Sequence, residues 1–175
     1  INDINQITEL FTYDKNGNTT SQKATNYTYD PLNRLINTDT NKYTYDSLHR
    51  CLTKNNTRFI YDGLNEIGSI TDGKINELRV LGATPNAEAG SAIAFEIDGI
   101  VYIPFYDLYG NVAKIVSLDE EIIENYSYTP FGETDAFNPI SPWLFFSKRY
   151  DTQTDLINFG RRLYMPSYGR WLTPD

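Results

Sequence analysis

Aspartates recur through the first part of the sequence at a constant step of sixteen residues, each directly after a tyrosine. Carboxylates can act as an acid and base pair or bind a cation, but only where several converge on one point. Asp side chains otherwise hydrogen-bond the backbone of the turn in which they lie. A constant spacing favours this second role, so we interpret the pairs as a structural repeat. The pairs are Tyr13-Asp14, Tyr29-Asp30, Tyr45-Asp46 and Tyr61-Asp62, and Tyr106-Asp107 restates them later.

The other residues that could do chemistry are few and scattered. The single histidine, His49, stands at a turn of the repeat, and we interpret it as an exposed turn residue. The single cysteine, Cys51, lies among apolar repeat positions, which predicts a small buried side chain. The acids at 119–121 predict a solvated turn, and Asp151 and Asp155 flank another turn. No Ser/His/Asp set, phosphate-binding glycine loop or metal-ligand spacing is present, so we expect no metal and no cofactor.

Each sixteen-residue unit has the pattern of a strand, a tight turn and a returning strand. Two aromatic residues sit two apart, as in Tyr27 and Tyr29, which places both on one face of a strand. Turn-forming residues follow the Asp, and apolar or β-branched residues then resume, as at Leu35-Ile36. Because one hairpin alone is marginally stable, each unit must lean on the next. The regular units, at 11–68, therefore predict an antiparallel sheet with stacked aromatic rings on one face.

Hairpin signals continue after the regular period ends. Asp72-Gly73 lies between apolar residues, which is a strong hairpin signal. The small residues at 82–91 predict a surface loop, the best candidate for mobility. The run at 100–106 is nearly all apolar or aromatic, which predicts a strand buried on both faces, with Pro104 at an edge or bulge.

The C-terminal residues 136–175 have a composition of their own. Basic residues gather there, including Arg149, Arg162 and Arg170, although the whole chain carries a net charge of −8. Because a buried guanidinium needs acceptors, we expect these arginines to meet carboxylates or backbone carbonyls. This pairing would suit an end segment packed against the sheet.

Length and charge exclude some classes of protein. A chain of 175 residues can bury a sizeable core. Its acidic balance argues against nucleic-acid binding, which depends on clustered Lys and Arg. No apolar run approaches the roughly 18 to 20 residues of a membrane span, and no signal peptide opens the chain. The repeat is already under way by residue 11, so we expect a fragment of a longer protein.

Two motifs resemble a known family. The phrase Tyr29-Asp30-x-x-Asn33-Arg34-Leu35 is similar to the YD repeats of Rhs proteins, of Tc toxin B and C components and, more distantly, of teneurins. The C-terminal residues resemble the Rhs repeat-associated core. The core-like positions are Arg149, Tyr150, Asp151, Arg162, Tyr164, Pro166, Gly169, Arg170, Trp171, Leu172 and Pro174.

The resemblance implies an all-β fold in which antiparallel hairpin repeats form part of a spiral shell. It implies a shell segment at 1–135 and an inward-curling core plug at 136–175. In such proteins the shell encloses a variable C-terminal polypeptide, often a toxin, which an aspartyl-type site releases by self-cleavage. Asp175 is the candidate catalytic carboxylate, and the resemblance places its second carboxylate beyond this chain. Implied partners are the rest of the parent chain and a shell-closing chain, and the implied location is secreted or cell-surface.

Three functions remain open from the sequence. The first is an inert structural piece of an encapsulating shell. The second is a self-cleaving core that becomes active in the full-length parent, with Asp175 in one catalytic role. The third is a carbohydrate or cell-surface binding module, because tyrosine rings can stack on sugars, although rings that face a core would explain the same composition.

Overall fold

A computed structural model describes residues 6–83 and 92–175. The predicted loop at 82–91 lies mostly outside these described residues. The strands are β1 (Phe11–Tyr13), β2 (Thr19–Gln22), β3 (Thr25–Tyr29), β4 (Leu35–Thr38), β5 (Tyr43–Tyr45), β6 (Cys51–Lys54), β7 (Thr57–Asp62), β8 (Asn65–Thr71), β9 (Lys74–Leu81), β10 (Ala92–Ile97), β11 (Ile100–Tyr106), β12 (Val112–Ser117), β13 (Ile122–Asn125), β14 (Arg149–Asp151), β15 (Leu156–Asn158), β16 (Leu163–Met165) and β17 (Arg170–Trp171). Two short 3-10 turns, η1 (Phe145–Ser147) and η2 (Pro166–Tyr168), complete the described elements. No helix among them is long and apolar enough to cross a membrane.

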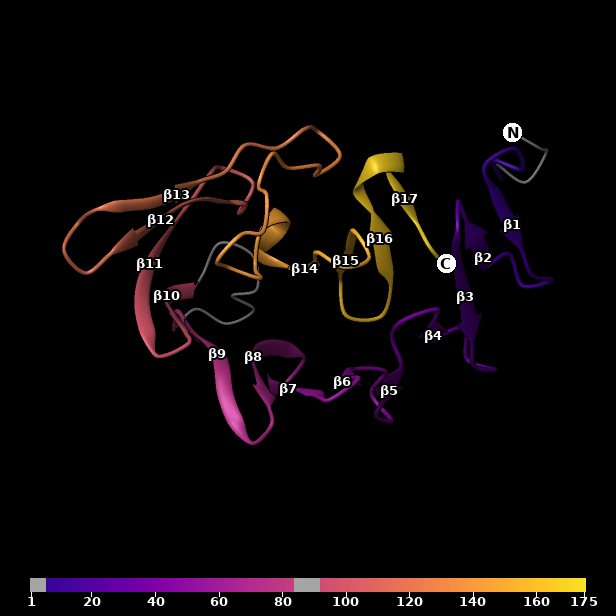
Figure 1. The fold of residues 1–175 in the computed structure, drawn as a ribbon, viewed down its shortest axis with the longest axis horizontal. Helices are drawn as coiled ribbons and strands as arrows, with labels where there is room; N and C mark the ends of the chain where they lie inside the picture. Colours follow the sequence, from indigo (N-terminus) through magenta and orange to yellow (C-terminus); the bar gives the residue numbers. More distant parts are fainter. Residues whose placement is uncertain (1–5, 84–91) are drawn as a thin grey trace.

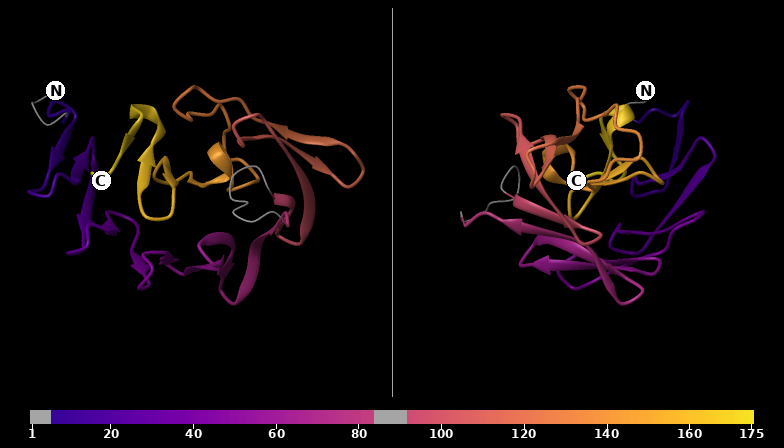
Figure 2. Two further views of the ribbon diagram at one scale, coloured as in Figure 1. Left: turned by 180° about the vertical axis from the view of Figure 1, so that it is seen from behind. Right: turned by 60° about the vertical axis from the view of Figure 1, so that its left-hand side comes forward.

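Strands β1 to β13 form a curved wall of antiparallel hairpins, in which strands that are consecutive in sequence pair with each other except at β4 and β5 (Figure 1). Backbone hydrogen bonding divides the wall into β1–β4 and β5–β13, and the bridge Asn37–Lys42 joins the two parts. Strands β14 to β17 form a separate antiparallel sheet. We call residues 136–175 the tail. Figures 1 and 2 show the tail strands on the concave side of the wall, so the wall curves around its own C-terminal segment.

A bulge at the repeated tyrosine bends five hairpins of the wall. The pairing register shifts between Thr12 and Tyr13, and it shifts in the same way at Tyr29, Tyr45, Tyr61 and Tyr106. An extra residue on one strand increases local twist and bends the strand. Repetition of the bulge at one end of these five hairpins therefore gives the wall a systematic source of curvature.

Two hydrophobic clusters join the wall to the tail. In the first, Phe11, Tyr27, Tyr43 and Phe59 of the repeat pack with Leu156, Met165 and Leu172 of the tail. In the second, wall residues such as Phe95, Val112 and Ile115 pack with Trp143 and Leu144. Both clusters include side chains that are fully or nearly fully buried. Because the wall is one sheet thick, the tail supplies the second layer that buries its inner face.

The expectation that the strand at 100–106 is buried on both faces is wrong. Tyr102 and Pro104 are buried, whereas Ile103 and Phe105 are exposed on the other face. Among the described residues no second layer covers the outer face of the wall here, so the apolar run alternates between core and surface. Pro104 lies beyond the residues of β11 that pair with β10, and next to a bulge, so its missing N–H removes no bond of that ladder.

Candidate functional site

The repeat aspartates hydrogen-bond their own turns. The Asp30 side chain accepts bonds from the backbone N–H groups of Leu32 at 2.9 Å and Arg34 at 3.0 Å, and from Arg34 Nε at 2.7 Å. Asp46 makes the same three contacts one repeat later, with Leu48 and Arg50. Burial opposes ionisation of both carboxyls, but the hydrogen bonds from the turn outweigh it and lower the pKa of each. Asp14 and Asp107 bind their turns in the same way, with Asn18 and Asn111 in place of arginine.

The repeat tyrosines join one hairpin to the one before it. The Tyr45 hydroxyl donates to the Leu35 carbonyl at 2.8 Å, and the Tyr61 hydroxyl donates to the Cys51 carbonyl at 2.8 Å. The Arg34 guanidinium lies 5.1 Å from the centre of the Tyr45 ring, and Arg50 lies 4.9 Å from that of Tyr61. The prediction that the rings stack on one another therefore needs a correction. The arginine of the preceding turn covers the tyrosine that directly precedes the repeat aspartate, as Arg34 covers Tyr45 and Arg50 covers Tyr61. Tyr29, Tyr106 and Tyr128 also donate to wall carbonyls.

The fourth unit departs from this pattern, and the departure marks where the tail docks. Asp62 pairs with Asn65 at the end of β7 across a two-residue turn, and within the described residues its side chain makes no hydrogen bond. Glu66 stands four residues after Asp62, where the two preceding units have Arg34 and Arg50. The charge at this repeat position is therefore reversed. The acidic side chain becomes a partner for a cation from elsewhere in the chain.

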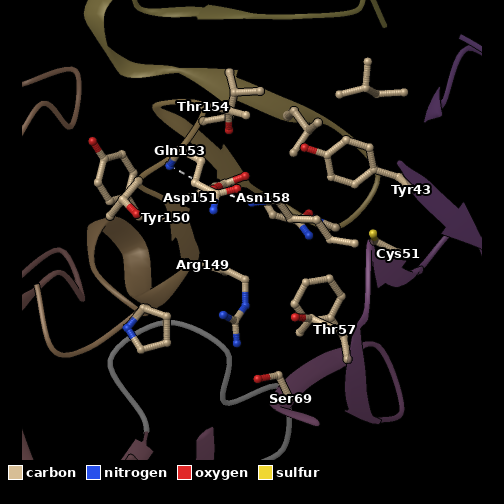
Figure 3. A pocket seen from close by; sticks show the side chains of 18 of the residues that line it. Tyr43, Cys51, Thr57, Ser69, Arg149, Tyr150, Asp151, Gln153, Thr154 and Asn158 are labelled. Carbon is tan, nitrogen blue, oxygen red and sulfur yellow. Dashed lines mark hydrogen bonds and ion pairs between the residues drawn. The ribbon is translucent and has the colours of Figure 1, made fainter. Parts of the chain in front are cut away.

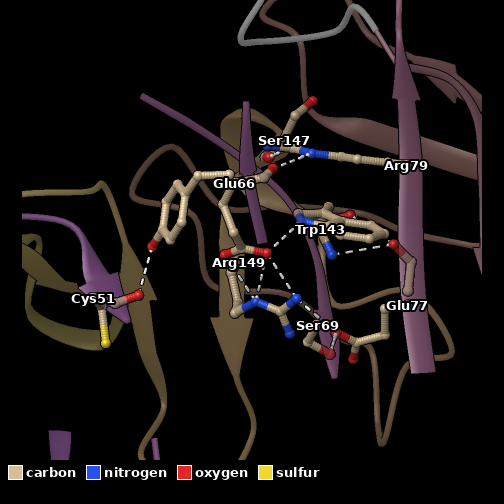
Figure 4. A network of polar contacts seen from close by, with 10 residues as sticks. Cys51, Glu66, Ser69, Glu77, Arg79, Trp143, Ser147 and Arg149 are labelled. Carbon is tan, nitrogen blue, oxygen red and sulfur yellow. Dashed lines mark hydrogen bonds and ion pairs between the residues drawn. The ribbon is translucent and has the colours of Figure 1, made fainter. Parts of the chain in front are cut away.

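That cation is Arg149 at the start of β14 (Figure 4). Its Nε lies 2.9 Å from both carboxylate oxygens of Glu66, and its Nη2 lies 2.8 Å from Glu66 Oε1 and 2.6 Å from Glu77 Oε2. The Ser69 hydroxyl also donates to Glu77, at 2.7 Å, and Trp143 Nε1 donates to Glu66, at 3.2 Å. We call Arg149 with Glu66 and Glu77 the clamp, because it ties β14 of the tail to β8 and β9 of the wall.

Aromatic rings enclose the clamp. The Arg149 guanidinium lies 4.9 Å from the centre of the Phe59 ring and 5.5 Å from that of Trp143, and Trp143 is fully buried. Burial alone would lower the pKa of Arg149, but the adjacent Glu66 and Glu77 outweigh it and raise that pKa. Burial would raise the pKa of Glu77, but Arg149 and Ser69 hold it below its usual value. Arg149 and Glu77 therefore stay ionised at neutral pH, and the arginine cannot act as a proton donor.

Gly68 allows the two wall carboxylates to approach. A Cβ atom built on Gly68 would lie 2.3 Å from the Glu77 carbonyl oxygen, which is backbone and cannot swing aside. Only a glycine therefore lets β9 lie this close to β8 at this point. Ser69 and Glu77 lie opposite each other across β8 and β9, and Glu77 shares the Arg149 guanidinium with Glu66.

A second polar tie and a cavity lie beside the clamp. Lys54 Nζ of the wall lies 2.7 Å from Asp151 Oδ1 of the tail. Between wall and tail is a cavity of about 300 Å³, shown in Figure 3, with Tyr43 and Cys51 on the wall side and Arg149 and Asp151 on the tail side. Burial raises the pKa of the Cys51 thiol to about 12, so the thiol stays protonated and is a poor nucleophile. Lys54 and Asp151 on either side of this cavity are paired with each other, and Arg149 is paired with Glu66 and Glu77.

The candidate catalytic residue lies away from the clamp. The Asp175 side chain is 93% exposed, and one of its oxygens pairs with Arg162 Nη1. Arg162 in turn lies 4.2 Å from the centre of the Trp171 ring. Within the described residues, no group of three or more His, Cys, Asp or Glu side chains could hold a metal ion. The Asp175 carboxylate is therefore in reach of solvent, and its ion-pair partner is Arg162 rather than Arg149 of the clamp.

The other core-like positions of the tail have packing and pairing roles. Tyr150 donates to Asp155 at 2.8 Å, and Tyr164 donates to the Phe131 carbonyl at 3.0 Å. Pro166 and Leu172 are buried, Tyr164 pairs with Trp171, and Met165 pairs with Arg170. Gly169 has a φ of 60° and closes η2, and Pro174 lies next to Gly17 of the first repeat turn. The structure thus spreads these positions over the tail sheet and its contacts with the wall.

Sequence reasoning missed Glu66, Glu77 and Trp143. The signal for Glu66 was present, since the alignment of the repeats puts an acid where arginine recurs. The general expectation that the tail arginines meet carboxylates or carbonyls agrees with the pairing of Arg149 and of Arg162. Glu77 carries no such signal, because it lies beyond the regular period.

The wall and its tail define a class of all-β protein in which antiparallel hairpins curve around the C-terminal strands of the same chain. The predicted all-β hairpin-shell fold is confirmed, because the same fold occurs in Tc toxin structures. The chain is similar to the crystal structure of TcdB2-TccC3, with 20% identity and a TM-score of 0.71, over 99% of this chain and 10% of that chain.

Two further structures agree. A Photorhabdus luminescens Tc holotoxin pore matches 99% of this chain and 10% of that chain, with 18% identity and a TM-score of 0.68. TcdB2-TccC3 without its hypervariable C-terminal region matches 93% of this chain and 9% of that chain, with 18% identity and a TM-score of 0.66. The chain therefore spans about a tenth of the length of each structure it matches. No family model matches the sequence, and no curated protein is significantly similar to it.

Proposed function

We propose that this chain is part of the encapsulating shell of a Tc-like or Rhs-like toxin, whose parent protein carries a variable C-terminal polypeptide inside the shell. The clamp is the observation that carries this proposal, because it fixes the end of the chain on the concave side of the wall. One of the similar structures is described as lacking a hypervariable C-terminal region, which supports an enclosed segment of this kind. In this proposal 1–135 serve as shell and 136–175 as the plug.

The partners follow from the edges of the wall. Strands β1 and β13 are the outermost strands of the wall in the described residues, and an edge strand presents unpaired N–H and C=O groups. We assign these edges to the rest of the parent chain and to a shell-closing partner chain. A secreted or cell-surface location belongs to the same proposal.

Limited proteolysis of the full-length parent tests this function. With an intact shell, the C-terminal polypeptide should resist a protease that digests it rapidly when it is expressed alone. Arg149→Met should expose it, because loss of the clamp frees the plug, whereas Arg161→Met should leave it protected, because Arg161 is exposed and lies outside the clamp. Equal digestion of the polypeptide in the wild-type parent and alone would contradict encapsulation.

Self-cleavage of the parent is a second candidate, favoured by the exposure of Asp175. Arg162 holds one of its oxygens, and the other has no partner among the described residues, so that oxygen can accept a proton from water. An aspartyl mechanism also needs a second carboxylate that shares a proton with the first. In the full-length parent, Asp175→Asn should abolish cleavage at unchanged folding, and cleavage at the wild-type rate would remove Asp175 from this role.

Carbohydrate binding loses the observation that motivated it. Tyr27 and Tyr43 are buried, and Tyr29, Tyr45 and Tyr61 are packed against the same inner cluster. Rings in this position are not free to stack on a sugar.

A further inference from the structure

A groove lies where two turns of the wall meet a loop of the tail. It has a volume of about 440 Å³ and is lined by the turns that contain Leu48 and Leu64 and by the loop 159–162 with Trp171. Leu48 and Leu64 are 52% and 66% exposed, and Trp171 is 36% exposed. Leu48 and Leu64 both stand two residues after the repeat aspartate. In the Leu48 turn, Asp46 binds the Leu48 N–H, which holds the turn with its leucine at the rim.

The charge of the groove is opposite to that of the chain. Its lining includes His49, Arg50, Arg161 and Arg162 and contains no Asp or Glu among the described residues, whereas the whole chain carries −8. Arg50 and Arg162 are each paired with a carboxylate just outside the lining, Asp46 and Asp175. Arg161 is exposed and forms no ion pair with any residue that the structure describes. Its charge is therefore available to a ligand.

The edge of the groove already holds a carboxylate. Asp175 binds Arg162, and Arg162 is held in place over the Trp171 ring, 4.2 Å from its centre. A guanidinium that is stacked on an aromatic ring loses little further freedom when it binds an anion. Arg161, the residue before Arg162, brings a guanidinium without an ion pair to the same lining, which suits a second carboxylate next to an apolar surface.

We propose that this groove binds a polypeptide segment of a partner that combines acidic with apolar side chains. The apolar side chains cover Leu48, Leu64, Phe159 and Trp171, and the carboxylates pair with Arg161 and its neighbours. A neutral apolar ligand would leave Arg161 without an ion pair, and a basic ligand would be repelled by it. The site is distinct from the clamp, so it stands or falls independently of the shell function.

The probe is a fluorescein-labelled octapeptide of alternating glutamate and leucine, and the readout is fluorescence anisotropy with the complete chain. We expect saturable binding that weakens by at least about tenfold in Arg161→Glu, because a like charge replaces an unpaired arginine. Leu64→Ser should weaken it several-fold by removing apolar contact. Lys74→Glu is the matched control. Lys74 is an exposed cation at the start of β9, opposite Thr71 at the far end of β8, so its substitution should not affect binding.

Three outcomes would overturn the proposal. The first is the absence of binding at millimolar protein. The second is equal binding of a lysine and leucine octapeptide, which would show that charge is not read. The third is an affinity that neither Arg161→Glu nor Leu64→Ser changes, which would place the peptide elsewhere. Both substituted residues are exposed, so circular dichroism is expected to show a wild-type fold for each variant.

Discussion

The repeat and the tail are held by contacts of very different reach along the chain. In the repeat, Asp14, Asp30 and Asp46 bind residues two and four positions on. Tyr29, Tyr45 and Tyr61 each bind a carbonyl ten positions back. In the tail, the clamp joins residues 72 and 83 positions apart, and Lys54 and Asp151 are 97 positions apart. The wall is thus assembled from neighbours, whereas the position of the tail depends on the finished wall. Loss of a tail contact should therefore affect docking as a whole, and loss of a repeat contact should be local.

Removal of the clamp arginine should give the largest effect. Arg149→Met leaves Glu66 and Glu77 partly buried without a cation, which costs about 3–5 kcal/mol of unfolding free energy by analogy with other broken buried pairs. Urea unfolding checks this value, and amide hydrogen exchange should show that β14 to β17 lose protection before β1 to β7. Arg161→Met is the control and should change stability by less than about 0.5 kcal/mol. A loss of similar size in both variants would show that the clamp does not hold the tail.

The close approach of β8 and β9 gives the next effect. Gly68→Ala should cost about 1–3 kcal/mol, because its Cβ cannot fit beside the Glu77 carbonyl and β9 must move away. The movement should also weaken the contact of Glu77 with Arg149. The measurement is the coupling between Gly68→Ala and Arg149→Met in a double-mutant cycle. Additive effects would mean that the two features are independent, contrary to the geometry.

Repeat contacts should each contribute less, and locally. Tyr45→Phe removes the bond to the Leu35 carbonyl and should cost about 1 kcal/mol. Tyr109→Phe is the matched control, since Tyr109 is 74% exposed and its hydroxyl makes no bond to the described residues. Thermal unfolding compares the two variants. Equal stabilities of the Tyr45→Phe and Tyr109→Phe variants would imply that the bond from the Tyr45 hydroxyl to the Leu35 carbonyl contributes nothing to the free energy of unfolding.

Acid should weaken the repeat turns by small steps. The pKa values of Asp30, Asp46 and Asp107 are lowered in the folded chain, so their contribution to stability is present above about pH 4 and is lost as the pH falls through their folded values. The free energy of unfolding measured in urea should therefore decline below about pH 4. Asp46→Asn should make the slope of this decline against pH shallower. A slope that this substitution leaves unchanged would exclude Asp46 from the acid response.

The sequence by itself determined the hairpins. A constant step of sixteen, paired aromatics and an Asp followed by turn-forming residues specify strands and turns because each interaction lies within one unit or the next. The two wrong expectations share one cause. The run at 100–106 was expected to be buried on both faces, and the tyrosines were expected to cover one another, because local sequence does not say how many layers a sheet has or which side chain arrives from the neighbouring turn.

Only the tertiary structure decided where the tail lies and what holds it. The motif positions of the tail are recognisable in the sequence, yet their partners Glu66 and Glu77 lie in the wall at distances along the chain that no local pattern encodes. The charge reversal at Glu66 becomes meaningful once Arg149 is seen beside it. The bulges that recur at the repeat tyrosines contribute to the curvature that brings them together, so this curvature is a property of the whole wall rather than of any one repeat.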